Sequence, residues 1–239
     1  MENYLFKFLS KESYVEEFRM GKIRLMSAYY YATLEQAKDS FCNNRFDATD
    51  GKSFLLNREN AKEAMDIQFA NNTKIQIGPG VESILINSEG SSKQLKISCY
   101  YALNRADIRE GKFKNVLDTM EDSLGDYYIT FLDPSEFARR VQNEVEKLKI
   151  QGIVKDFGMK CVEYYDANKF TGVAGPFLKP DILKWQREYR LLIETIEQSD
   201  PFYIDIGDIR DITMWGKVED LYNGYIVDEN TTYLPNVWK

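Results

Sequence analysis

The start of the chain alternates between short apolar segments and one amphipathic stretch. Residues 4–9 are aromatic and apolar and predict a β-strand. A helix should follow, with Ser10 or Ser13 as its N-cap and Gly21 just beyond its end, because serine favours the first position and glycine the last. Residues 22–27 predict a second strand. The N-terminal unit is therefore expected to be strand, helix, strand.

In the middle of the chain the sequence predicts mainly short strands, turns and loops. Residues 28–39 predict a loop turning into a helix, and the polar segment 43–53 predicts a loop. Residues 72–103 predict three consecutive strands of a β-meander, the first closed by the turn Gly78-Pro79-Gly80. Residues 104–125 are charged and irregular and predict a helix or a loop.

The last part combines one long helix with several strands. A helix should begin after the cap Asp133, with apolar residues at helical spacing at Phe137, Val141, Val145 and Leu148. Strands are predicted over 126–132, 158–165, 187–194, 202–207 and 212–217. This order does not alternate strand and helix regularly, so it predicts an α+β fold with a mixed or antiparallel sheet and flanking helices. We expect one domain over residues 1–239, with the meander as an insertion.

Composition narrows the chemistry that this fold could carry. The chain has no histidine, which excludes Ser-His and Cys-His nucleophile pairs, histidine-bound zinc and the usual neutral-pH base. Its three cysteines are widely spaced, so they predict buried small side chains and neither disulfides nor a metal site. A net charge of −7 argues against a broad nucleic-acid-binding face. The basic residues Arg139, Arg140, Lys147 and Lys149 share their helix with acidic ones and predict a solvated face.

Nothing in the chain predicts membrane attachment. No apolar run approaches the roughly 20 residues of a membrane span. The N-terminus lacks the basic and apolar regions of a signal peptide. We therefore expect a cytoplasmic protein.

The segment Gln186-x-Glu188 opens a predicted strand and is the strongest chemical pattern. Alternate side chains of a strand share a face. One face should carry Gln186, Glu188, Arg190 and Glu194, and the core face Tyr189, Leu191 and Ile193. An ordinary amphipathic strand has the same alternation, so a purely structural role is the simpler alternative.

The order of these elements resembles the ADP-ribosyltransferase superfamily. An N-terminal strand with a basic residue, a helix, a strand ending in Ser27, a tyrosine cluster and a later strand opening with Q-x-E carry the resemblance. It implies a split β-sheet, NAD as substrate and a toxin-like activity. It makes Glu188 the catalytic carboxylate that stabilises the oxocarbenium-like ribose cation as nicotinamide leaves, and Gln186 the residue that orients the acceptor.

The same resemblance implies a cofactor site in the N-terminal elements. Lys7 takes the position where the family usually carries His or Arg, Ser27 would support the site, and Tyr29 or Tyr30 would stack on nicotinamide. From its loop, Arg45 could contact a phosphate, with a solvated turn as the alternative. The resemblance leaves residues 54–157 unmatched.

Two other functions stay open. Asp107, Glu110 and Lys112 weakly resemble the carboxylate and lysine pattern of a metal-dependent nuclease. A non-catalytic binding domain of the same fold is the other. For a transferase, the acceptor would be a protein, RNA or single-stranded DNA in bacterial or phage conflict, with an antitoxin protein as a further partner and no metal.

Lys179 is expected to be an exposed loop charge, although it could approach a phosphate.

Overall fold

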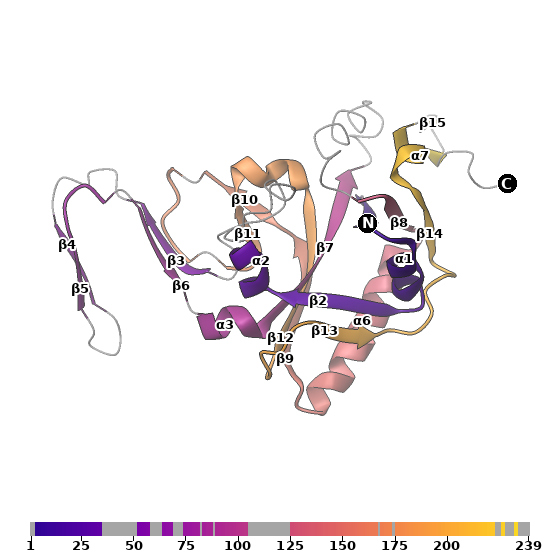
Figure 1. The fold of residues 1–239 in the computed structure, drawn as a ribbon, viewed down its shortest axis with the longest axis horizontal. Coiled ribbons are helices and arrows are strands. Elements are labelled where there is room, and N and C mark those ends of the chain that lie inside the picture. The colour runs from indigo at the N-terminus through magenta and orange to yellow at the C-terminus, as the bar shows by residue number, and fades with distance from the viewer. Residues whose placement is uncertain are drawn as a thin grey trace.

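The computed structural model describes residues 3–34, 52–57, 64–68, 74–81, 83–87, 89–104, 125–166, 168–173, 175–222, 226–227 and 232–233. They form an α+β fold, a mostly antiparallel open sheet with a few helices (Figure 1). This confirms the predicted fold class at that level. The predicted loop at 43–53 and the irregular segment 104–125 lie almost entirely outside the described residues.

The main sheet is built around the longest described strand, β7. Its eight strands are β1 (Asn3–Leu9), β2 (Lys22–Ser27), β7 (Leu95–Asn104), β8 (Tyr127–Phe131), β9 (Val154–Cys161), β12 (Glu188–Thr195), β13 (Phe202–Asp205) and β14 (Thr213–Lys217). On one edge of β7, β1 pairs with one end and β2 with the other, while β12 pairs along the opposite edge and is followed by β9. The two N-terminal strands therefore diverge from a common neighbour.

The helices complete the main body. They are α1 (Glu12–Arg19), α2 (Ala28–Leu34), α3 (Glu89–Gln94), α6 (Pro134–Ile150), α7 (Val218–Tyr222) and the 3₁₀ helix η1 (Asp181–Gln186). α1 and α6 supply buried side chains to the largest core, on one face of the sheet. Phe137, Val141 and Val145 of α6 are fully buried there, as their spacing predicted. None of the described helices is long and apolar enough to cross a membrane.

The helix starts show where local signals succeed and where they fail. Asp133 caps α6 as predicted, because its carboxylate accepts bonds from the backbone N–H groups of Ser135 (3.0 Å) and Glu136 (2.9 Å). α1 begins after Lys11 without a side-chain cap, so the predicted serine caps are wrong. α2 begins directly at the end of β2 rather than after a loop.

The strands before β7 pair differently from the predicted meander. β3 (Lys52–Asn57) pairs with β6 (Ser83–Asn87), and β4 (Met65–Gln68) pairs with β5 (Lys74–Ile77). These two ribbons extend away from the main sheet in Figure 1. β7 lies in the main sheet instead, separated from β6 by α3, which begins where a turn was expected. The alternation located these strands, but it does not choose their partners.

Two further strand pairs are short. β10 (Glu163–Tyr165) runs parallel to β11 (Leu178–Pro180), and β15 (Ile226–Val227) pairs with β16 (Thr232–Tyr233). The strand predicted over 158–165 is thus divided between the end of β9 and β10. The β10–β11 pair positions the segment that covers the candidate site.

Candidate functional site

Glu188 is the first residue of β12 and lies on the sheet face that also carries Tyr101 of β7, its direct partner. Arg190 shares this face, as the alternation predicted. Gln186 does not belong to the strand, because it ends η1. The chain turns from η1 into β12 at Arg187, whose φ of 40° is left-handed.

Glu188 forms a buried ion cluster with two cations. Its Oε1 lies 2.5 Å from Nε of Arg190, and its Oε2 lies 2.7 Å from Nζ of Lys179. The same Lys179 ammonium donates to Oε1 of Gln186 at 2.9 Å. We call Lys179, Gln186, Glu188 and Arg190 the Glu188 cluster. Lys179 is only 2% exposed, so its prediction as an exposed loop charge is wrong.

The surroundings keep Glu188 ionised. Burial opposes the charged form, but the charges of Arg190 and Lys179 outweigh it and hold the pKa of Glu188 well below its usual range. The neighbouring thiol of Cys99 responds in the opposite sense: burial, and then the charge of Glu188, raise its pKa to about 12. With two cations and one carboxylate, the cluster carries one excess positive charge inside an acidic protein.

Residues 175–180 cover the cluster and are called the strap. The strap contributes Lys179, and its Pro176 carbonyl accepts a hydrogen bond from Nη1 of Arg190. Its Phe177 packs against the apolar cluster around Ile97, which Cys99 also contacts. Strap contacts therefore hold both cations around Glu188.

Lys7 lies on the other face of the sheet. Phe6 pairs with Tyr101, the partner of Glu188, so the next residue, Lys7, points to the opposite side. Its ammonium donates to the Cys99 carbonyl at 2.8 Å and lies 5.0 Å from the centre of the Tyr100 ring. The structure does not bring Lys7 into the Glu188 cluster, because one step along a strand reverses the side-chain direction.

Ser27 is fully buried, and its hydroxyl forms hydrogen bonds that hold the start of α2. Its Oγ accepts the Tyr30 N–H at 3.0 Å, at the start of α2, and donates to the Asp200 carboxylate. Asp200 is itself paired with the buried Lys96 at 2.8 Å. Ser27 pairs with Lys96 in the sheet and so faces away from Glu188. These contacts pin α2 to the sheet.

The tyrosines of α2 divide between surface and core. The Tyr29 ring has the Lys93 ammonium 4.6 Å from its centre, and Tyr30 is 36% exposed. Tyr31, which the sequence pattern did not single out, packs against the apolar cluster that Cys99 and Phe177 also contact. Of the three rings it is the one that shares this cluster with Phe177 of the strap. Arg45 lies outside the described residues.

Sequence reasoning missed the partners of Glu188. Lys179 lies nine residues before Glu188, but in a predicted loop where an exposed charge was expected, and no local signal linked it to Glu188. Arg190 was visible two residues after Glu188 on the same face, which was the available signal.

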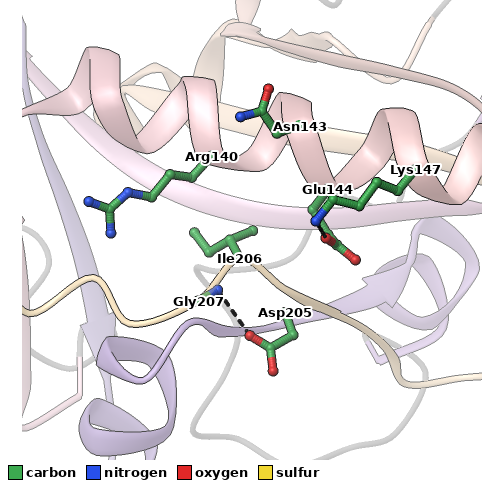
Figure 2. A pocket seen from close by; sticks show the side chains of 7 residues that line it. All are labelled: Arg140, Asn143, Glu144, Lys147, Asp205, Ile206 and Gly207. Atoms are coloured by element: carbon green, nitrogen blue, oxygen red, sulfur yellow. Dashed lines mark hydrogen bonds and ion pairs between the residues drawn. The ribbon is translucent and has the colours of Figure 1, made fainter.

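A hollow lies away from the Glu188 cluster, between α6 and the turn after β13 (Figure 2). It has a volume of about 270 Å³. Its charged groups are already engaged: Lys147 pairs with Glu144 at 2.8 Å, and the Asp205 carboxylate accepts the Gly207 N–H at 3.0 Å. Arg140 at its rim pairs with Asp211. The hollow therefore presents a self-neutralised surface.

The cysteines and acidic residues add no metal site to the described part of the chain. Cys161 is exposed and Cys99 is half-buried, so the prediction of buried cysteines is wrong for Cys161, while Cys42 lies outside the described residues. Within the described ranges, no group of three or more His, Cys, Asp or Glu side chains could hold a metal ion. The nuclease-like segment at 107–112 is not among them.

No family model, curated protein or solved structure matches the chain. Its function must therefore be argued from its own residues.

Proposed function

We propose that this chain is an NAD-dependent ADP-ribosyltransferase in which Glu188 is the catalytic carboxylate. The observation that carries the proposal is the convergence of Gln186 Oε1 and Glu188 Oε2 on one cation, the Lys179 ammonium, at 2.9 and 2.7 Å. Two oxygens that already hold one cation form a site where another could be stabilised. The two Q-x-E residues meet there although only one of them lies in the strand.

The chemistry needs a cation-stabilising carboxylate and no histidine. As nicotinamide leaves NAD, positive charge develops on the ribose, and an ionised carboxylate in a water-poor site stabilises that charge. The lowered pKa of Glu188 keeps it ionised at neutral pH, against the effect of burial, through Arg190 and Lys179.

The fold supports the same proposal. β1 and β2 meet one edge of β7 at its two ends and diverge, which agrees with the split sheet that the superfamily resemblance implies. The proposal does not use Lys7 as the NAD anchor, because Lys7 is on the other face. Ser27 acts through the position of α2, and Tyr31, which packs against the same apolar cluster as Phe177, takes the place of Tyr29 and Tyr30.

For the acceptor, we propose a protein or a single-stranded nucleic acid. The net charge of −7 disfavours the broad phosphate contacts of duplex DNA. A toxin that acts in the cytoplasm during bacterial or phage conflict, restrained by an antitoxin protein, is the biological setting that fits this activity.

One observation favours a second candidate, a non-catalytic binding domain. Glu188 is 4% exposed and both its carboxylate oxygens are paired, as in a purely structural ion cluster. In that case the cluster would stabilise the fold and turn over no NAD.

Nicotinamide release from NAD by the purified protein tests the proposal. Glu188→Asp keeps the buried charge but withdraws the carboxylate by one methylene. We therefore expect kcat to fall by about 100-fold or more in a folded protein. Glu194→Gln is the matched control, since Glu194 lies on the same strand and face but is exposed, and its activity should be unchanged. An inactive wild-type protein would favour the binding domain.

A parallel assay with EDTA addresses the nuclease. We expect nicotinamide release to persist in EDTA. Cleavage of nucleic acid that EDTA abolishes and magnesium or manganese restores would replace the transferase with a metal-dependent nuclease.

A further inference from the structure

The strap contacts the groups that the proposed reaction needs through its Lys179 side chain and its Pro176 carbonyl. Lys179 Nζ occupies Gln186 Oε1 and Glu188 Oε2, and the Pro176 carbonyl engages Arg190. No ligand could reach the Glu188 carboxylate while the Lys179 ammonium remains 2.7 Å from it in a site 4% exposed. The strap therefore occludes the site that it completes.

The strap is attached by few contacts compared with the sheet beneath it. Its strand β11 is three residues long and pairs with the equally short β10. Backbone bonds from Glu163 N–H to the Phe177 carbonyl (2.9 Å) and from Leu178 N–H to the Gly175 carbonyl (3.0 Å) complete it. β12, by contrast, is paired along both edges. Segments with few backbone bonds open locally at lower free energy than central strands.

We propose that the strap is an autoinhibitory element in which Lys179 acts as an internal competitor for the cation position at Gln186 and Glu188. The strap opens as a unit, withdrawing Lys179 and Phe177, and a positively charged part of the ligand takes the place of the ammonium. The identity of that ligand as NAD, whose nicotinamide ring is cationic, rests on the proposed function. The opening itself does not.

An exchange of one cation for another keeps the buried carboxylate paired. Withdrawing Lys179 leaves Glu188 paired with Arg190 but removes the donor 2.7 Å from its Oε2, and losing a hydrogen-bond donor at a buried carboxylate oxygen is unfavourable. A neutral ligand would force that situation, whereas a cationic one avoids it. The strap should therefore favour oxidised NAD over its reduced, uncharged-ring form.

Opening can be measured without any ligand through Cys99, which pairs with Arg190 in the sheet and packs against the same apolar cluster as Phe177. Cys42→Ser with Cys161→Ser leaves Cys99 as the sole thiol. Burial and the charge of Glu188 raise the pKa of Cys99 to about 12, so iodoacetamide at pH 8 should label it slowly. In this background Lys179→Met should accelerate labelling at least about tenfold, because the opened strap exposes the thiol and this outweighs the loss of the Lys179 charge, which lowers the Cys99 pKa.

Lys155→Met is the matched control. Lys155 also pairs with a glutamate of β12, at 3.1 Å, but it is half exposed and outside the strap. It should leave the labelling rate within about twofold of the background. Unchanged labelling in folded Lys179→Met would overturn the proposal, as would equal acceleration in both variants.

Low concentrations of urea separate local opening from global unfolding. Local opening exposes little surface, so the Cys99 rate should be nearly independent of urea below the unfolding transition. Labelling that rises with the full unfolding slope would count against an independent strap. If Lys179→Met does not fold, hydrogen exchange in the wild-type protein decides: the Glu163 and Leu178 amides should exchange faster than those of Leu191 and Ile193, and equal rates would overturn the proposal.

Steady-state kinetics connects the strap to the reaction. Removing the competitor raises the fraction of binding-competent protein, so Lys179→Met should lower KM for NAD about tenfold and change kcat less. If Lys179→Met releases nicotinamide with an unchanged KM and shows unchanged Cys99 labelling, the autoinhibitory role of the strap is refuted and the transferase activity is retained. If Cys99 labelling changes as expected but the protein never releases nicotinamide, the transferase activity is refuted and the opening of the strap is retained.

Discussion

The Lys179 ammonium and the Glu188 carboxylate form an ion pair at 2.7 Å with only 3% and 5% of the two side chains exposed. β12 carries a second lysine–glutamate pair on the same face, between Lys155 and Glu194 at 3.1 Å, with 40% and 38% exposed. The two glutamates lie on the same face of β12, and their lysine pairs differ in burial and in the second cation, Arg190, that Glu188 contacts. They therefore allow the cost of disturbing the Glu188 cluster to be measured against an internal reference.

Replacing Glu188 by glutamine should destabilise the protein strongly. Lys179 and Arg190 would then face a neutral amide in a buried site, a situation that typically costs about 3–5 kcal/mol in the free energy of unfolding. Glu194→Gln should cost less than about 1 kcal/mol because its partner is screened by water. Urea denaturation measures both. Equal, small losses would show that the cluster is open to solvent.

Stability should fall at acidic pH through Glu188. Its folded pKa is lowered from the ordinary 4.5, because Arg190 and Lys179 outweigh the opposing effect of burial, so its stabilisation is present above the unfolded value and is lost as the pH falls below it. Lys179→Met with Glu188→Leu and Arg190→Met removes this titration. The wild-type protein should lose more unfolding free energy than this triple variant between pH 5 and 3.

Exposed carboxylates cancel in that comparison. The pKa values of Glu136 and Asp208 are lowered to about 2 by hydrogen bonds from neighbouring arginines, and both groups are present in each protein. Parallel pH profiles for the two proteins would contradict a lowered pKa at Glu188.

Lys7→Met tests the face assignment. Lys7 contacts Ser98 at 3.1 Å and the Cys99 carbonyl on the sheet face opposite Glu188. We expect a loss of about 1–2 kcal/mol in unfolding free energy, from unmade hydrogen bonds, while KM for NAD stays within about threefold. Nicotinamide-release kinetics and urea denaturation give both values. A tenfold rise in KM at unchanged stability would restore Lys7 as a cofactor anchor.

Two glycines with left-handed backbone conformations allow the cost of steric overlap to be measured apart from the cost of backbone strain. Gly21 has φ 95° and a Cβ there would lie 2.0 Å from the Gly207 carbonyl oxygen, whereas Gly152 has φ 73° and nothing within 4 Å. Gly152→Ala should cost about 1–2 kcal/mol through strain alone. Gly21→Ala should cost more than about 3 kcal/mol, since two backbones must move apart. Similar melting temperatures for the two variants would contradict the close approach of Gly207.

Local patterns were sufficient wherever a segment's own residues decide its conformation. Asp133 and the spacing of Phe137, Val141 and Val145 predicted α6 and its buried face, because capping and helical periodicity act within a few residues. In the same way, the alternation in 187–194 placed Glu188 and Arg190 on one face. The carboxylate and one of its two cations were thus visible in the sequence.

Partner choice could not be predicted in this way. β5 pairs with β4 instead of β6, and Lys179 reaches Glu188 from the strap, because neither contact leaves a periodic trace in the sequence. A one-residue step along β1 also decides that Phe6 and not Lys7 shares the face of Glu188. The sequence by itself determined the helix α6, the approximate positions of the strands of the main sheet and the faces of single strands. Only the tertiary structure decided which faces meet and which charges are buried together, since those depend on contacts between residues far apart in the chain.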